Sequence, residues 1–181
     1  MTCSGYVLAG GRSSRMGRDK ALLPFHGAPL AEAVARRVEE AAGSVTIVGH
    51  PALGGIGDRY PGEGPLGGIL TALHHTSAEW NLIVACDMPQ VSAGLLRRLL
   101  SIAAVSPALV ILPHGPEGRP EPLCAVYSTR ALPALEAAFA GGIRKVTTAL
   151  AELPVERLDI SEVADFQNVN TPEDWSAYAA E

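Results

Sequence analysis

Short apolar runs alternate along this chain with longer segments in which apolar residues recur at helical spacing. In residues 30–38, for example, Leu30, Val34 and Val38 lie four apart, on one face of a helix. Further helices are predicted over 66–74 and 95–104. The short runs predict strands at 6–8, 44–48, 81–86, 108–112 and 123–127. Such an alternation is typical of an α/β fold.

The run at 81–86 is continuously apolar after its first residue, as expected of a central parallel strand covered on both faces. The sequence therefore predicts a Rossmann-like, doubly wound, mostly parallel sheet with helices on both faces. No internal repeat, low-complexity tract or composition break marks a linker, so residues 1–181 are predicted to form a single domain.

The composition narrows the classes of partner. With 14 Lys and Arg against 19 Asp and Glu, the net charge is −5, whereas nucleic-acid-binding domains usually carry a basic excess. Any local cluster of cations is therefore expected to serve a small anion. Three widely spaced cysteines without a CxxC pattern indicate neither a disulfide framework nor a zinc site. We expect a cytoplasmic protein without a targeting or membrane-spanning segment.

A loop rich in glycine and cations follows the first predicted strand, in the segment LAGGRSSRMGRDK at 8–20. Gly10 and Gly11 lack a Cβ, so their backbone N–H groups can approach anionic oxygens, and Arg15 and Lys20 supply positive charge. The spacing fits neither the dinucleotide fingerprint nor the Walker A loop. A plain surface turn is the alternative, but the cations and the preceding strand favour a polyphosphate site.

Asp87 directly follows the apolar run at 81–86 and is the candidate metal ligand. Ligands of doubly wound sheets bind at the carboxyl ends of the strands, and Mg²⁺ prefers one or two carboxylates together with phosphates and water. Asp87 could equally cap the helix that begins near Ser92 or make a turn before Pro89.

Two other segments also allow both a ligand-binding and a purely structural interpretation. The glycine-rich stretch at 58–69 opens a helix, and its backbone N–H groups could read a base edge or form an ordinary turn. Asn168 and Asn170 are alternate residues, so their amides could point together toward a ligand or satisfy neighbouring loops.

Taken together, these segments resemble the molybdenum cofactor guanylyltransferases, the MobA-type branch of the nucleotidyltransferase superfamily. The similarity rests on LAGGRSSRMGRDKALLPF at 8–25, Asp58 with GPLGGI at 64–69, CDMP at 86–89, PLCAVY at 122–127 and NVNTPED at 168–174. One departure is Gly49, which stands near where some relatives have an asparagine in the nucleotide pocket.

The resemblance implies an Mg²⁺-dependent transfer of GMP from GTP to the phosphate of molybdopterin, with release of pyrophosphate. By position it assigns Asp87 to the metal and Asn168 and Asn170 to the pterin side. The residues that it implies for the nucleotide are Leu8, Ala9, Gly10, Gly11, Lys20, Asp58 and Asp87.

Phosphoryl transfer needs positioning and charge neutralisation more than covalent chemistry, so Lys20, Asp87 and Arg15 are the expected catalytic residues. No catalytic role is expected for His26, His74, His75 or Cys86.

Arg144 and Lys145 form a second cationic position before a predicted helix and are expected either to hold the pterin substrate or a partner protein, or to be simply solvated. Transient contacts with other cofactor-biosynthesis proteins and with recipient molybdoenzymes are also expected. Two alternatives stand beside guanylyl transfer. One is transfer from CTP or another NTP, and the other is a nucleotide-binding adaptor without catalysis.

Overall fold

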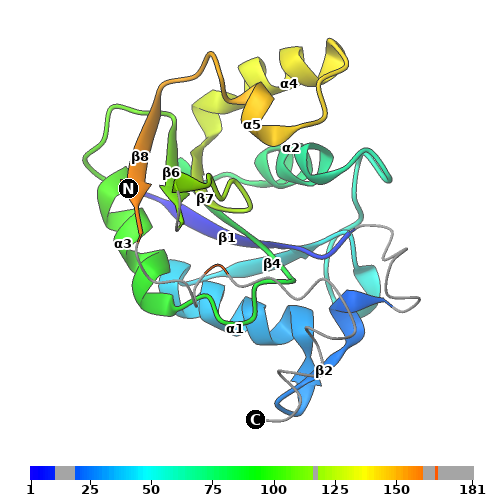
Figure 1. Ribbon diagram of the computed structural model, residues 1–181. Coiled ribbons are helices and arrows are strands. Elements are labelled where there is room, and N and C mark those ends of the chain that lie inside the picture. Colours follow the sequence, from blue (N-terminus) through cyan, green and yellow to red (C-terminus); the bar gives the residue numbers. More distant parts are fainter. Residues whose placement is uncertain (11–18, 116–117, 161–165, 167–181) are drawn as a thin grey trace.

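The computed structural model describes residues 1–10, 19–115, 118–160 and 166. Its centre is a six-stranded sheet with the strand order β4-β1-β5-β7-β6-β8 (Figure 1). The strands are β1 (Cys3–Leu8), β4 (Val45–Val48), β5 (Trp80–Ala85), β6 (Val110–His114), β7 (Cys124–Ser128) and β8 (Val155–Asp159).

The sheet is mostly parallel, as predicted. β1 pairs in parallel with both β4 and β5, so that Leu8 lies opposite Val48 on one side and Ala85 on the other. β6 and β8 are also parallel to each other. β7 lies between β5 and β6 and is antiparallel to both. The carboxyl ends of β4, β1, β5, β6 and β8 therefore meet at one edge of the sheet, where β7 begins.

Helices cover both faces of the sheet, which confirms the doubly wound architecture (Figure 1). Helices α1 and α3 pack together on one face, and α2 and α4 contact each other on the opposite face. The helices are α1 (Leu30–Ala42), α2 (Pro65–His75), α3 (Ala93–Ala103), α4 (Leu132–Ala140) and the short α5 (Val146–Ala149).

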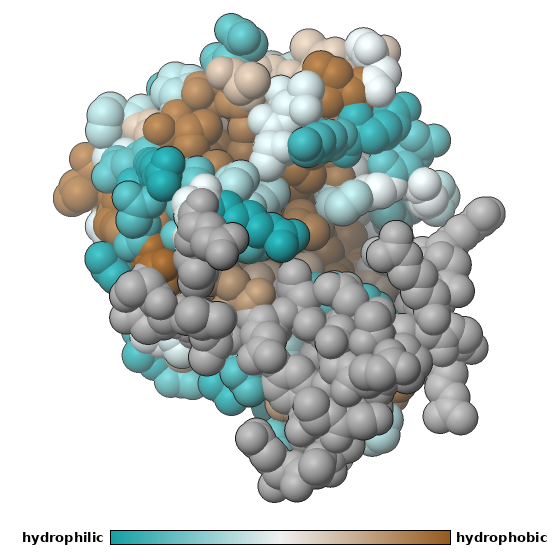
Figure 2. Space-filling view, viewed as in Figure 1, coloured by the Kyte–Doolittle hydropathy of each residue, from teal (hydrophilic) through white to brown (hydrophobic). Residues whose placement is uncertain are grey.

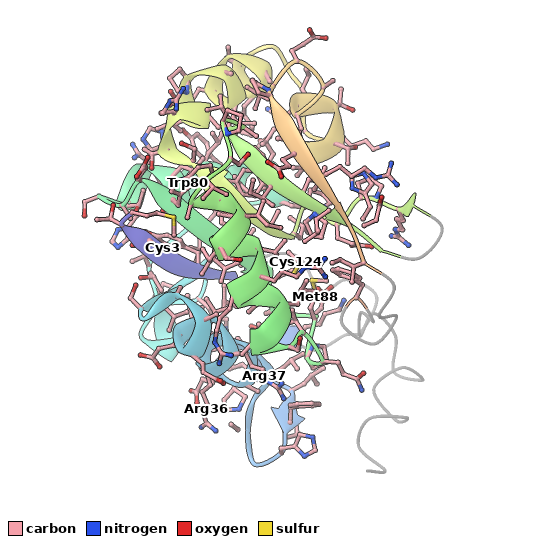
Figure 3. All side chains as sticks on the ribbon, turned by 90° about the vertical axis from the view of Figure 1, so that its left-hand side faces the viewer. Cys3, Arg36, Arg37, Trp80, Met88 and Cys124 are labelled. Carbon is pink, nitrogen blue, oxygen red and sulfur yellow. The ribbon has the colours of Figure 1, made fainter. Side chains whose placement is uncertain are left out.

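Alternation along each strand divides the core into two layers. In β5, Leu82 and Val84 pack beneath α1 and α3, whereas Ile83 packs toward α2. All six residues of β5 are buried, which confirms the prediction of a central strand covered on both faces. On α1 the predicted apolar face is buried, and Arg36 and Arg37 are exposed on the outer side (Figure 3).

Several short elements differ from the sequence prediction or were absent from it. The edge strand β8 has the sequence VERLD, whose side chains are half-buried or exposed, so it carried no apolar run to mark it. The strands β2 (Pro24–Phe25) and β3 (Ala28–Pro29) form a hairpin, and each is only two residues long. The helix predicted over 95–104 begins at Ala93, because the Ser92 side chain accepts a hydrogen bond from the backbone N–H of Leu95.

No helix in the described ranges is both long and apolar enough to cross a membrane. On the face that Figure 2 shows, hydrophilic and apolar residues are interspersed over the described part of the surface.

Gly5 lets β1 approach the end of α1 closely, and this contact can be tested. A Cβ at Gly5 would overlap the Ser44 carbonyl oxygen and Cγ1 of Val38. We expect Gly5→Ala to lower the free energy of unfolding by about 1–3 kcal/mol, since overpacking forces backbone shifts. Urea unfolding measures the loss. Gly57→Ala is the matched control because nothing lies within 4 Å of its added methyl group; equal effects of the two substitutions would contradict the overpacking argument.

Candidate functional site

A cavity of about 330 Å³ opens at the edge of the sheet where the parallel strands end. Its volume falls within the range of small-molecule sites. The walls come from the ends of β1, β4 and β5, from the turn at Lys20 and from the loop that leads into α2. The lining residues are Leu8, Ala9, Gly10, Asp19, Lys20, Val48, Asp58, Gly62, Gly64, Pro65, Gly68, Ala85, Cys86, Asp87 and Leu123.

The structure brings together most of the residues that the sequence assigned to nucleotide binding. The lining residues from that set are Leu8, Ala9, Gly10, Lys20, Asp58 and Asp87. Gly11, Arg15, Asn168 and Asn170 lie outside the described residues. Their roles at the nucleotide and on the pterin side stay predictions.

Lys20 and Asp87 face each other across the cavity. Lys20 is the first residue of the 3₁₀ turn η1 (Lys20–Leu22), and Asp87 follows β5 by two residues. The Lys20 Nζ lies 3.6 Å from Asp87 Oδ2, and both side chains are largely buried, with 19% and 25% of their surface exposed. Burial raises the pKa of Asp87, and the positive charge of Lys20 only partly offsets this effect.

Asp87 does not serve as the cap of the following helix. Ser92 caps α3, so the helix-cap interpretation of Asp87 is wrong. Within the described part of the chain, no cluster of three or more His, Cys, Asp or Glu residues is arranged to hold a metal ion. A desolvated carboxylate at a cavity wall fits Mg²⁺ that arrives with phosphate oxygens and water, because that ion needs only one or two protein carboxylates.

Glu121 adds negative charge near Asp87. Burial raises the pKa of Glu121, the positive charge of Arg119 lowers it, and the negative charge of Asp87 raises it. The Arg119 Nε lies 3.7 Å from Glu121 Oε1, but the arginine is mostly exposed. Sequence reasoning missed Glu121 because it follows no strand end; it lies in the connection that brings the chain into antiparallel β7.

Gly10, which lines the cavity, packs closely against Gly49, where the chain leaves β1 and β4. Gly49 has a φ of 87°, and a Cβ there would lie 2.5 Å from the Gly10 Cα and 2.7 Å from its N. Glycine at position 49 therefore has a structural reason in this chain, since the backbone of Gly10 occupies the space that a side chain would need.

Asp58 links the cavity wall to α2. Its Oδ1 accepts hydrogen bonds from the Tyr60 backbone N–H at 2.9 Å and from the buried Thr71 hydroxyl at 2.8 Å. The adjoining loop has positive φ angles at Gly62 and Gly64, and Pro65 is the first residue of α2. Pro65 thus lies where the turn interpretation of residues 58–69 predicts, but the same loop lines the cavity, so a contact between its N–H groups and a base edge stays a prediction.

Of the residues for which no catalytic role was expected, Cys86 lines the cavity, whereas the three histidines do not. Burial raises the pKa of Cys86 to about 12, so this thiol stays protonated near neutral pH. His74 Nε2 lies 2.8 Å from Glu136 Oε1, whereas the ring of His75 packs edge-on against Tyr6. His26 lies on the β2–β3 hairpin, away from the cavity lining.

Arg144 and Lys145 are not among the residues that line the cavity. The Arg144 guanidinium lies 3.9 Å from the centre of the Phe139 ring, and its Nη1 donates to the Phe139 carbonyl at 2.8 Å. Its Nε also lies 2.5 Å from Glu63 Oε2. Arg144 thus joins the end of α4 to the loop before α2, while Lys145 is exposed.

Several cavity residues were not assigned to the site from the sequence, and Asp19 and Leu123 are two of them. Asp19 lines the cavity beside Lys20, and Leu123 enters it from the position directly before β7. The signal for Asp19 was its place next to Lys20 in the cation-rich loop. For Leu123 the rule that selects carboxyl ends fails, because β7 runs antiparallel to its neighbours.

Comparisons with known proteins agree with this geometry. Residues 5–155 match the family model described as MobA-like NTP transferase domain. A molybdenum cofactor guanylyltransferase of Xanthomonas euvesicatoria pv. vesicatoria is 38% identical, over 96% of this chain and 92% of the relative.

Solved structures share the fold. The molybdopterin-guanine dinucleotide biosynthesis protein A of Archaeoglobus fulgidus has a TM-score of 0.84 and 28% identity, with 97% of this chain and 96% of that one covered. A manganese complex of the Mycobacterium tuberculosis protein Rv0371c has a TM-score of 0.67, with 100% of both chains covered. At 18% identity the latter shows the fold alone.

The raised pKa of Asp87 predicts a stability effect with a definite sign. A carboxyl whose pKa is higher in the folded than in the unfolded protein contributes stability below pH 3.8, and that contribution is lost as the pH rises through the folded pKa. We therefore expect Asp87→Asn to be at least as stable as the parent at pH 7, as judged by urea unfolding.

Asp159→Asn is the control, because that carboxylate is 74% exposed and lies outside the cavity lining. Its replacement should change the free energy of unfolding at pH 7 only slightly, because an exposed ion pair such as that with Arg157 contributes little to stability. An Asp87→Asn protein that is clearly less stable than its parent at pH 7 would contradict the argument.

Proposed function

Because the chain belongs to the MobA-like NTP transferase family and is a nucleotidyltransferase, we propose that it transfers GMP from GTP to the phosphate of molybdopterin. Pyrophosphate leaves, and the product is the guanine dinucleotide form of the molybdenum cofactor. The observation that carries this proposal is the juxtaposition of Lys20 and Asp87 in one cavity with Gly10 just past the end of β1.

The proposed reaction needs little covalent work from the protein. A phosphate oxygen of the acceptor forms a bond to the α-phosphorus of GTP, and the bond from that phosphorus to the bridging oxygen of pyrophosphate breaks. The second pKa of a phosphate monoester is about 6, so the attacking oxygen is largely ionised near neutral pH and needs no general base.

The chain's own residues supply position and charge. Lys20 places its ammonium group where phosphate oxygens would enter the cavity, and there it would offset the charge that develops on the leaving pyrophosphate. Gly10 lines the same cavity, and a Cβ there would lie only 3.3 Å from the Gly49 Cα and 3.6 Å from Asp58 Oδ2, so glycine keeps this part of the wall compact.

Asp87 is the residue that would hold Mg²⁺. When bound, the ion would polarise the phosphate oxygens and neutralise part of their charge. The positive charge of Lys20 offsets part of the increase that burial causes in the pKa of Asp87. It thereby favours the ionised carboxylate that a metal requires.

Two alternatives remain beside guanylyl transfer. Transfer from CTP or another NTP would use the same phosphate and metal contacts, so the base alone separates it from the proposal. An adaptor that binds nucleotide without catalysis does not need a lysine paired with a largely buried carboxylate. The pair of Lys20 and Asp87 therefore argues against the adaptor. Cytoplasmic location and transient contacts with other cofactor-biosynthesis proteins stay predictions.

The nucleotide preference is tested directly with the purified protein. It is incubated with Mg²⁺, molybdopterin and each NTP separately, and released pyrophosphate is measured. We expect release with GTP and little with the other nucleotides. Release with CTP and not with GTP would overturn the choice of base, and no release with any NTP would favour the adaptor.

The roles of Lys20 and Asp87 predict large losses of turnover. Lys20→Ala and Asp87→Ala should each lower kcat by about 100-fold or more, because electrostatic contacts to the developing charge act mainly in the transition state. Asp159→Ala, which removes an exposed carboxylate outside the cavity lining, should retain parental turnover. Near-parental activity of Asp87→Ala at saturating Mg²⁺ would contradict its role at the metal.

The pterin-side role of Arg144 and Lys145 is tested best at Lys145. Arg144→Ala would also remove the contacts that join α4 to the loop before α2, so a change in affinity would be ambiguous. Lys145 is exposed, and its replacement by alanine should raise the apparent KM for molybdopterin several-fold without changing the thermal stability. An unchanged KM in Lys145→Ala and in the double alanine variant would remove both residues from the proposed pterin site.

A further inference from the structure

A histidine at the end of the edge strand reaches into the turn that carries Lys20. His50 follows β4 by two residues, and its Nε2 lies 2.9 Å from Oδ2 of Asp19, 31 positions away in sequence. A carboxylate oxygen can only accept, so Nε2 is the donor in this hydrogen bond. The bond ties the residue directly before Lys20 to the sheet.

Asp19 uses its other oxygen to begin the turn. Its Oδ1 accepts a hydrogen bond from the Ala21 backbone N–H at 3.0 Å, which caps η1. The turn is completed by hydrogen bonds from the Leu22 and Leu23 N–H groups to the carbonyls of Asp19 and Lys20. Lys20 is therefore the first residue of a turn whose cap is held from outside by His50.

His50 is itself fixed to the sheet. Only 11% of its side chain is exposed, and its Nδ1 is buried without a hydrogen-bond partner among the described residues. Its chain neighbour Gly49 is anchored by a hydrogen bond from its N–H to the Ile56 carbonyl at 2.8 Å. Within the described part of the chain, the bond to Asp19 is the one hydrogen bond that repays the burial of this ring.

We propose that His50 is a positioning residue for nucleotidyl transfer, which acts through Asp19 to hold the Lys20 ammonium group opposite Asp87. This inference rests on the proposed function for its kinetic consequence, but the geometry that it concerns exists without nucleotide. Asp19 has 47% of its side chain exposed, so without His50 its carboxylate would have several solvated orientations, and only some of them cap η1. A catalytic cation gains most when its position is fixed before the substrate binds.

How tightly Lys20 is held can be tested through the reactivity of its amine, because the chain has a second lysine as a reference. Lys20 and Lys145 are its only lysines. The folded, nucleotide-free protein is treated with an amine-reactive acylating reagent. Mass spectrometry then follows the rate of modification of each lysine separately. The exposed Lys145 serves as the internal reference. We expect His50→Ala to accelerate the modification of Lys20 about threefold or more relative to Lys145, because Lys20 is less tightly held opposite Asp87.

His50→Gln is the matched variant. The glutamine amide can donate a hydrogen bond at the place of the histidine Nε2, so we expect it to return the Lys20 rate to near the parental value. His75→Ala, which removes a histidine that packs on Tyr6, should leave the rate unchanged. Equal Lys20 rates in the parent and in His50→Ala would overturn the inference. So would a His50→Gln protein that behaves like His50→Ala while remaining folded by circular dichroism.

Kinetics supply the second readout. His50→Ala should lower kcat with GTP by about tenfold, with a smaller effect on the KM for molybdopterin, and His50→Gln should restore most of the loss. In a Lys20→Ala background, the same His50→Ala change should cost nothing further, because the group that it positions is gone. Additive losses would overturn the inference. An inactive parent would instead overturn the proposed function, while the acylation rates would still decide whether His50 holds Lys20.

Discussion

The parallel pairing of β1 with β5 is the constraint on which the site depends. Leu8 lies opposite Ala85, and the ladder continues with a hydrogen bond from the Cys86 N–H to the Leu8 carbonyl at 3.0 Å. The chain therefore leaves both strands at the same level, with Gly10 on one side and Asp87 on the other. Burial of both faces of β5 by the helix layers holds this register, since a slip of one residue would exchange the two core layers.

The alternation of strands and helices predicted the architecture, and the rule of carboxyl ends predicted Lys20 and Asp87. The direction of β7 was beyond that reasoning, because an apolar strand has the same pattern whichever way it runs. Residues that enter the site directly before β7, such as Leu123, were missed for this reason, together with Glu121 in the preceding connection. β8 was missed because its partly exposed side chains give no apolar run.

Contacts between distant segments were equally beyond sequence reasoning. The sequence shows Asp19 as a neighbour of Lys20 and His50 as a residue after a strand, but no spacing signals that they meet. Asp58 was assigned to the nucleotide by resemblance, while its hydrogen bond to Thr71, 13 positions away, emerged only from the packing of α2. The need for glycine at Gly49 likewise follows from its approach to the Gly10 backbone.

The electrostatics of the cavity favour a ligand that carries both signs of charge. The pKa of Asp87 is raised because the effect of burial is larger than the attraction of Lys20. Lys20 alone therefore does not offset the cost of burying the ionised carboxylate. A free anion would be attracted by Lys20 but repelled by Asp87 and Glu121, and a free cation would meet the reverse situation. A divalent metal bound to a polyphosphate presents its positive centre to the carboxylate and its oxygens to the ammonium group. This complementarity is the physical reason for proposing a metal–nucleotide complex rather than either component alone.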